Sequence, residues 1–166
     1  MATASWASSQ LYLLTGNQYY ADKAVEFIEY VLECQQKEPV GEEAINGFFW
    51  RDKSRKSIVH YIHQSREQFY MMAMESLLDT QPEHKDRSRW DESVHLYAEY
   101  ILSIFDYTAP YNMIPSGIYH IDEPSDTEAF YALHLFPPAD ARERYDRQIR
   151  NGIRITDEFY IKRFPI

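Results

Sequence analysis

Residues 21–32 read ADKAVEFIEYVL and residues 91–102 read DESVHLYAEYIL, an offset of 70 positions. Both stretches have apolar residues at the three- and four-residue spacings that line one helix face, and both close on Glu-Tyr-aliphatic-Leu. A Leu-Leu pair precedes each of them, at 13–14 and at 77–78. Two explanations of the match stay open: an internal repeat, or the chance similarity that any two amphipathic helices share. A period of 70 is longer than the ~34 residues of common helical repeats and favours helical hairpins joined by long loops.

The apolar periodicity predicts two such helical hairpins, over residues 1–36 and 65–106. The first contains a helix over 2–15, stopped by Gly16-Asn17, and a helix over 22–36, ended by Pro39 and Gly41. The second contains a helix over 66–79 and another over 88–105. The residues predicted to face inward from helices 22–36 and 88–105 are Ala24, Phe27, Ile28, Val31, Gln35, Trp90, Val94, Tyr97, Ile101 and Ile104.

The segments outside these hairpins carry other patterns. Residues 47–50 and 57–61 flank a polar turn, which predicts a β-hairpin over 47–62. Residues 107–166 are predicted to form a cleft-side loop with short helices near 127–135 and 139–151. The first part of this segment, 107–120, is too aromatic to be disordered, and a long irregular connection in a compact domain is typically functional. The predicted fold class is mainly α, an αα-hairpin repeat with a small β-hairpin and a long loop.

Composition bounds the class of protein. The chain has 166 residues, 45% of them apolar, which suffices for the core of one domain or of a piece of a larger one. A net charge of −9 argues against partners that are nucleic acids or anionic membranes. Aromatic residues make up 16% of the chain, which suits a protein that handles hydroxylated ligands and equally suits Tyr packing between helices. Cys34 is the only cysteine; it excludes an intrachain disulfide and is predicted to be a buried thiol.

The sequence gives no targeting signal from which the compartment could be inferred. Residues 1–10 lack the charged and apolar regions of a signal peptide, and no apolar run reaches membrane-spanning length. The chain starts almost directly with helix and closes on Arg163-Phe164-Pro165-Ile166, which we interpret as the ends of a fragment.

The densest polar cluster is HYIHQSREQ, residues 60–68, directly before the helix at 66–79. Ser65 is a good N-cap, and Gln68 lies three residues on, as a capping box requires. The cluster is therefore predicted to lie at a helix N-terminus, where free N–H groups and the helix dipole favour anionic or hydroxyl-rich ligands. The competing interpretation is structural: Ser65 and Gln68 only cap the helix, while Arg66 and Glu67 are solvated.

Other chemistry has weaker support in the sequence. His60 and His63 have no third ligand at a recognised spacing, so we expect no metal site there and no cofactor. Asp122, Glu123 and Asp126 have the oxygen ligands that calcium prefers, but they also fit a solvated acidic loop. No Gly-rich phosphate loop, nucleophile elbow or Ser/His/Asp constellation is present.

Five sequence blocks, taken in order, resemble a bacterial group within glycoside hydrolase family 9. The blocks are Gly47-Phe48-Phe49-Trp50-Arg51-Asp52, His63-Gln64-Ser65-Arg66-Glu67-Gln68, Tyr107-Thr108-Ala109-Pro110-Tyr111, Ile114-Pro115 and Tyr119-His120-Ile121-Asp122-Glu123. The resemblance covers nearly the whole chain and implies a partial (α/α)6 toroid, the six-hairpin glycosidase fold, with helices 2–15 and 66–79 on the inside. It implies substrate-binding roles for His63, Gln64, Arg66, Glu67, Tyr107, Tyr111 and His120.

The family's catalytic residues have no counterpart here. Inverting glycosidases use a carboxylate base and a carboxylic acid roughly 6.5–9.5 Å apart. In this family the base belongs to an Asp-Ala-Gly-Asp motif, which this chain lacks, and the chain stops before the position of the acid. No catalytic residue can therefore be carried over.

The resemblance implies a fragment of an enzyme that hydrolyses β-linked glycans with inversion, the fragment itself being inactive. Its expected partners are an oligo- or polysaccharide and the remaining hairpins of the parent toroid. The resemblance is compatible with a parent protein that is secreted or periplasmic. The alternative function is a non-catalytic helical-repeat module that binds a glycan or a protein. Because each hairpin of a repeat buries apolar faces against its neighbours, we expect the isolated chain to be loosely packed, dimeric or aggregation-prone.

Overall fold

The computed structural model describes residues 1–40, 44–56, 58–59, 66–105, 118–120, 153–154 and 159–161. It contains the helices α1 (Ala2–Thr15), α2 (Gln18–Glu33), α3 (Arg66–Thr80) and α4 (Arg87–Phe105). The strands are β1 (Ile118–His120), β2 (Ile153–Arg154) and β3 (Phe159–Ile161). The described part of the chain is thus mainly helical, as predicted. None of its helices is long and apolar enough to cross a membrane.

Three helices match their predicted bounds to within a residue, while α2 is displaced toward the N-terminus. Gly16 ends α1 in the left-handed conformation, at φ 65°, and its N–H donates to the Tyr12 carbonyl. Asn17 then caps α2 by accepting from the Tyr19 N–H at 3.0 Å, so α2 starts four residues before the predicted Asp22.

The predicted C-terminal end of α2 at Gln36 is wrong, because residues 34–36 pair with the segment that follows. The Gln36 N–H donates to the Phe48 carbonyl at 2.8 Å, and the Trp50 N–H donates to the Cys34 carbonyl at 2.9 Å. These extended backbone bonds replace the last helical turn, and α2 ends at Glu33.

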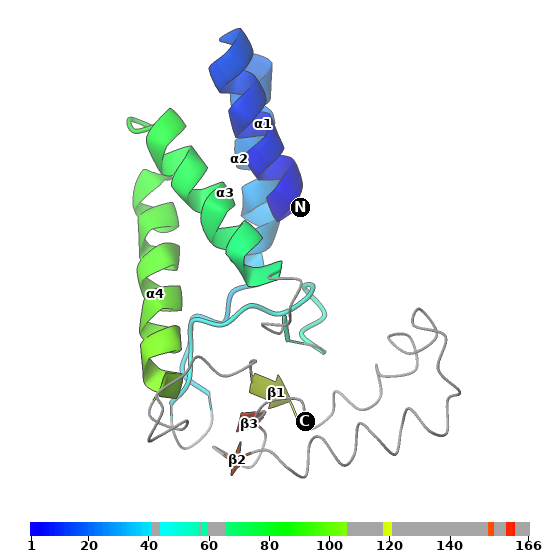
Figure 1. The fold of residues 1–166 in the computed structure, drawn as a ribbon, viewed down its shortest axis with the longest axis vertical. Helices are drawn as coiled ribbons and strands as arrows, with labels where there is room; N and C mark the ends of the chain where they lie inside the picture. The colour runs from blue at the N-terminus through cyan, green and yellow to red at the C-terminus, as the bar shows by residue number, and fades with distance from the viewer. Residues whose placement is uncertain are drawn as a thin grey trace, which may run out of the picture.

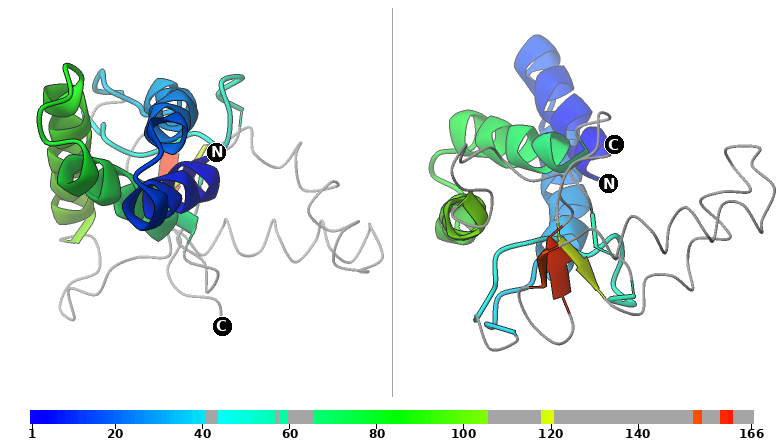
Figure 2. Two further views of the ribbon diagram at one scale, coloured as in Figure 1. Left: turned by 90° about the horizontal axis from the view of Figure 1, so that it is seen from above. Right: turned by 60° about the horizontal axis from the view of Figure 1, so that its bottom comes forward.

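Helices that follow one another along the chain run antiparallel, and α2 lies behind α1 in the view of Figure 1. Figure 1 shows α1 and α3 running upward and α2 and α4 running downward. The most extensive helix contacts join α1 to α2 and α1 to α3, while α4 packs on α3. Figure 2 shows that α3 crosses α1 obliquely. Small residues allow the close approach of α1, since Ser5 is fully buried and its hydroxyl donates to the Ala24 carbonyl at 2.7 Å.

The main core lies among the helices and confirms most of the predicted inner faces. Ile28 and Trp90 are fully buried, and Val94 and Tyr97 are partly buried against the same cluster. Cys34 is 2% exposed, which confirms the predicted buried thiol. The buried residues of this cluster are Ala2, Ala24, Ile28, Val31, Leu32, Phe49, Val59, Ala73, Met74, Leu77 and Trp90.

The predicted β-hairpin is present only as a short pairing. Trp50 and Ile58 form an isolated antiparallel bridge, and the Val59 N–H donates to the Phe49 carbonyl at 2.8 Å. Phe49 also bridges to Gln35, so this short segment lies between the end of α2 and residues 58–59. Residues 57 and 60–62 of the predicted hairpin lie outside the described part.

A small antiparallel sheet lies below the helices in Figure 1, in the strand order β1-β3-β2. Ile118 of β1 pairs with Ile161 of β3, and Ile153 of β2 pairs with Ile161 from the other side. The sequence pattern predicts no strand in these positions. Ile118 is fully buried in a second core cluster with Ile45, Phe48, Trp50, Ile58, Tyr100 and Ile104. The helices predicted near 127–135 and 139–151, and most of the aromatic loop, lie outside the described residues.

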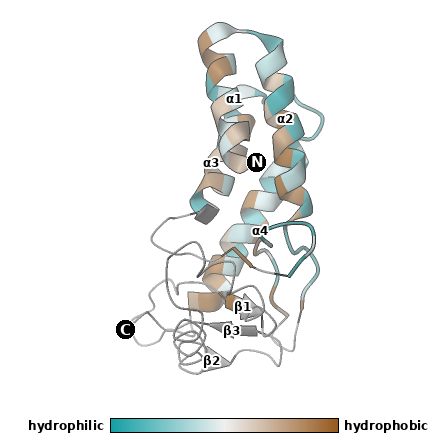
Figure 3. Cartoon of the chain, turned by 90° about the vertical axis from the view of Figure 1, so that its right-hand side faces the viewer, coloured by the Kyte–Doolittle hydropathy of each residue, from teal (hydrophilic) through white to brown (hydrophobic). Residues whose placement is uncertain are grey.

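Several apolar side chains remain on the surface of the helices. Leu13 and Leu14 of α1 are 61% and 81% exposed, and Leu102 of α4 is 68% exposed. Figure 3 shows the apolar colouring at the upper end of α1. The helices therefore bury a core between them, while their outer surface carries exposed leucines.

Candidate functional site

Three of the predicted substrate-binding residues, Arg66, Glu67 and His120, lie in described elements. Arg66 and Glu67 form the first turn of α3, and His120 is the last residue of β1, opposite Phe159 of β3. For these three residues the backbone position is defined. His63, Gln64, Tyr107 and Tyr111 lie outside the described residues, as does the proposed N-cap Ser65. The predicted convergence of the seven side chains on one ligand therefore stays a prediction.

An aromatic cluster fixes the position of the first turns of α3. The Phe49 ring is fully buried and meets the Tyr70 ring edge to face, with ring centroids 4.9 Å apart. Phe49 also contacts Tyr97 of α4 at 5.8 Å. Phe48, the neighbouring residue, lies in the same buried cluster as Ile118 of β1. Tyr70 and Ile118 are thereby brought close to the segment 48–49.

A buried hydrogen-bond network connects the end of α2 to α4. The Gln35 amide donates to the carbonyls of Gly47 and Ser93, at 3.1 and 3.0 Å, and its oxygen accepts from the Ser93 hydroxyl at 2.5 Å. All of the hydrogen-bonding capacity of this amide nitrogen is used inside the protein. The adjacent Gln36 amide oxygen accepts from the Trp50 indole N–H at 3.0 Å. These bonds satisfy polar groups that burial would otherwise penalise.

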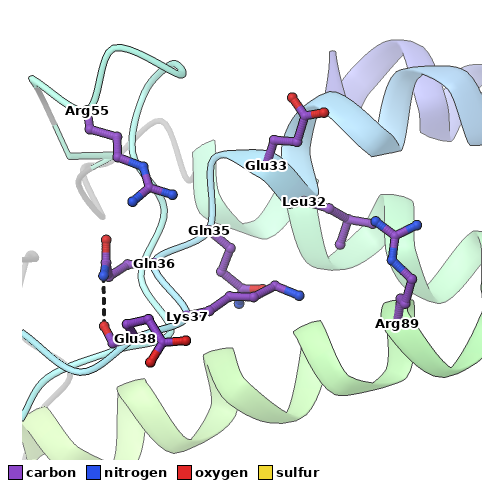
Figure 4. Close-up of a pocket in the computed structure, with 8 residues that line it drawn as sticks. All are labelled: Leu32, Glu33, Gln35, Gln36, Lys37, Glu38, Arg55 and Arg89. Carbon is purple, nitrogen blue, oxygen red and sulfur yellow. Dashed lines mark hydrogen bonds between the residues drawn. The ribbon is translucent and has the colours of Figure 1, made fainter.

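A cavity of about 340 Å³ lies beside this network. Its lining comes from the end of α2 and the residues after it, from the turn at 51–56, and from the first turns of α4. Figure 4 shows Arg55 on one side of the cavity and Arg89 on the opposite side, with Lys37 and Gln35 between them. The lining residues are Leu32, Glu33, Gln35, Gln36, Lys37, Glu38, Arg55 and Arg89.

The charged groups of this cavity differ in whether they have a partner. Arg89 donates to both oxygens of Glu29, at 3.1 and 3.0 Å, and this hydrogen bonding raises the pKa of Arg89. Glu33 forms an ion pair with Lys53. Among the described residues, neither Lys37 nor Arg55 has a carboxylate within ion-pair distance of its side chain.

Two nearby groups titrate away from their usual ranges. Burial raises the pKa of the Cys34 thiol, and the Asp52 carboxylate adds to this effect. The pKa of Asp52 is lowered, chiefly by hydrogen bonds from Ser54, whose N–H lies 2.7 Å from the carboxylate. A thiol with a raised pKa is a poor nucleophile, so Cys34 does not have the environment of a catalytic cysteine.

Sequence reasoning did not anticipate this cavity. In the sequence, the basic run 51–56 predicts the tip of a hairpin, in which Asp52 is expected to be structural. The only local signal is the density of cations, Arg51, Lys53, Arg55 and Lys56, in a chain of net charge −9. Within the described residues, no group of three His, Cys, Asp or Glu side chains is placed to hold a metal ion.

Comparison with known proteins identifies no relative: no family model, curated protein or solved structure matches the chain.

Proposed function

We propose that this chain is the glycan-binding part of a family 9-like glycoside hydrolase, built from two hairpins of an α/α toroid. The observation that carries the proposal is that the first resemblance block packs against residues that closely follow the second block or directly precede the last one. Phe49 of the first block contacts Tyr70, one turn into the helix that begins with Arg66, and Phe48 shares a buried cluster with Ile118. His120 follows two residues later in β1.

The direction of the helices supports the same proposal. In a toroid of helical hairpins the inner helices share one direction, so that their N-termini and the loops before them surround a common cleft. Helices α1 and α3 pack together and run the same way, with α2 and α4 opposite to them. Arg66 at the start of α3 would then offer its fork of five N–H donors to sugar hydroxyls or to a carboxylate substituent.

The test is calorimetric titration of the whole chain with cello-oligosaccharides. Arg66→Ala should weaken binding by about 1.5–3 kcal/mol, the range for hydrogen bonds to charged groups, with little change in melting temperature. Arg87→Ala is the matched control, because it removes the same side chain from the first turn of α4 instead. Lost stability with unchanged affinity in Arg66→Ala would instead make Arg66 a structural brace.

Catalysis gives a second test. Since the base motif and the acid of the family have no counterpart in this chain, we expect no turnover of β-glucans or aryl glycosides by the chain alone. Turnover that persists through purification and is abolished by Glu67→Gln would overturn this expectation and place a catalytic carboxylate in the first turn of α3.

A non-catalytic module that binds a protein is the second candidate. It is favoured by the exposed leucines of α1 and α4, Leu13, Leu14 and Leu102. Failure of every cello-oligosaccharide to bind the folded chain would favour this second candidate.

A further inference from the structure

The cavity between the end of α2 and the start of α4 has a charge unlike that of the whole chain. Its lining carries three cations, Lys37, Arg55 and Arg89, and two carboxylates, Glu33 and Glu38, whereas the chain has a net charge of −9. Two of these five charged side chains already form ion pairs: Arg89 with Glu29, and Glu33 with Lys53. Among the described residues, no ion pair involves Lys37 or Arg55, so these two side chains supply the cationic charge for a ligand.

The backbone of Arg55 supplies an independent observation. Arg55 has φ 55°, in the left-handed region, which costs a residue with a side chain roughly 1–2 kcal/mol. The strained position is held by the turn that Asp52 organises, since the Arg55 N–H donates to the Asp52 carbonyl at 3.2 Å. Strain of this kind in a residue that lines a cavity points to a role for its side chain.

The Gln36 amide adds a neutral hydrogen-bond donor to the two cations of the cavity. The Gln36 side chain is buried, and within the described part of the chain its amide nitrogen donates to the Glu38 carbonyl alone, at 2.7 Å. An amide nitrogen carries two N–H groups, so one of them remains for a ligand in the cavity. Two cations and an N–H group around a space of about 340 Å³ match an oxyanion carried on a small molecule.

We propose that this cavity binds a small hydroxylated molecule through its phosphate monoester group. The phosphate lies between Lys37 and Arg55 and accepts from the Gln36 amide, while hydroxyl groups of the ligand donate to the carboxylate of Glu38. The site is separate from the α3 N-terminus that carries the proposed glycan-binding function, and neither assignment depends on the other.

The test is titration of the whole chain with glucose 6-phosphate, inorganic phosphate and glucose, at low and at high ionic strength. We expect saturable binding of glucose 6-phosphate that is tighter than that of phosphate and weakens with salt, and none of glucose. Arg55→Gly removes the cation and also relieves the backbone strain, so the variant should be at least as stable as the parent chain while its affinity falls by about tenfold or more.

The matched control is Lys56→Gln, which removes a positive charge from the same turn at a residue that does not line the cavity. It should change the affinity by less than about twofold, since exposed charges are screened. Lys37→Gln should weaken binding as Arg55→Gly does. Three results would overturn the proposal: absence of saturable binding up to roughly 10 mM ligand, equal binding of glucose, or equal losses in Arg55→Gly and Lys56→Gln. The binding of cello-oligosaccharides serves as a separate readout, which Arg55→Gly should leave unchanged.

Discussion

The approach of Gly47 to α4 is the most sharply defined packing constraint in the fold. Gly47 has φ 90° and its N–H donates to the Gln36 carbonyl at 2.7 Å, while its carbonyl accepts from the Gln35 amide. A Cβ atom at this position would lie 2.9 Å from the Leu96 carbonyl carbon and from Tyr100 Cβ, and closer still to the Leu96 oxygen. Because the obstacle is helix backbone, no side-chain rotation can relieve the clash.

These distances allow the effect of Gly47→Ala to be estimated. The left-handed backbone contributes about 1–2 kcal/mol of strain, and overpacking against α4 adds a further 1–3 kcal/mol. Gly16→Ala is the matched control, since Gly16 also has a positive φ, 65°, but nothing lies within 4 Å of the added Cβ. It should show the strain alone, about 1–2 kcal/mol.

Urea unfolding of the two variants beside the parent chain measures both contributions. In a thermal melt each kcal/mol lowers Tm by roughly 2–4 °C for a chain of this size. The difference between the two variants isolates the steric contribution of the contact between Gly47 and α4. Equal destabilisation by Gly47→Ala and Gly16→Ala would refute the close approach and, with it, the docking of segment 47–50 on α4.

Three further outcomes follow from buried or titrating groups. Ser93→Ala leaves the buried Gln35 oxygen without its 2.5 Å donor and should lower the free energy of unfolding by about 1–3 kcal/mol, measured in urea. Cys34, buried and with a raised pKa, should react with a thiol reagent such as DTNB only as the chain opens, so rapid labelling of the folded chain would contradict the packing. The lowered pKa of Asp52 means that its stabilisation is present above the unfolded pKa of about 3.9 and is lost as pH falls through the folded value; Asp52→Asn should therefore flatten the acid limb of the stability profile.

Local pattern predicts the helices of this chain well, because the signals that define them are local. Apolar spacing, the Gly16 stop and the position of Phe105 give the bounds of α1, α3 and α4 to within a residue. The end of α2 is different. Gln35 continues the helical spacing in the sequence, yet it leaves the helix because its amide is held by Gly47 and Ser93, 12 and 58 residues away.

The early start of α2 has a local cause, the Asn17 cap, whereas long-range pairing explains why the strands and the cavity are absent from the sequence-based expectations. Strand β1 pairs with β3 about forty residues later, and short strands of two or three residues give too little periodicity to be predicted alone. The cavity also depends on contacts between residues that are far apart in the sequence. Its residues come from three separate parts of the chain, and the partner of Arg89 is Glu29, 60 positions earlier. A single sequence contains no local pattern for such a meeting.

Two aligned leucines of the similar segments 21–32 and 91–102 differ in burial. Leu32 of α2 and Leu102 of α4 align when the two similar segments are offset by 70 residues, yet Leu32 is 4% exposed and Leu102 is 68% exposed. In a row of hairpins the outer helix packs on its own inner helix and on the inner helix of the next hairpin. For α2 that next helix is α3, whose Ala73, Met74 and Leu77 share its core cluster. No described element takes the corresponding place beside Leu102.

This difference yields a paired mutational test of the hairpin arrangement. Leu32→Lys buries a charge in the main core and should lower the free energy of unfolding by about 3 kcal/mol or more. Leu102→Lys in the same chain should stay within about 0.5 kcal/mol of the parent, as surface substitutions do. If a further hairpin covers α4 in a longer form of the protein, Leu102→Lys should become destabilising there while Leu32→Lys keeps its effect. A Leu102→Lys variant that is as tolerated in the longer form as in this chain would exclude a next hairpin beside α4, and with it the toroid arrangement that the repeat implies.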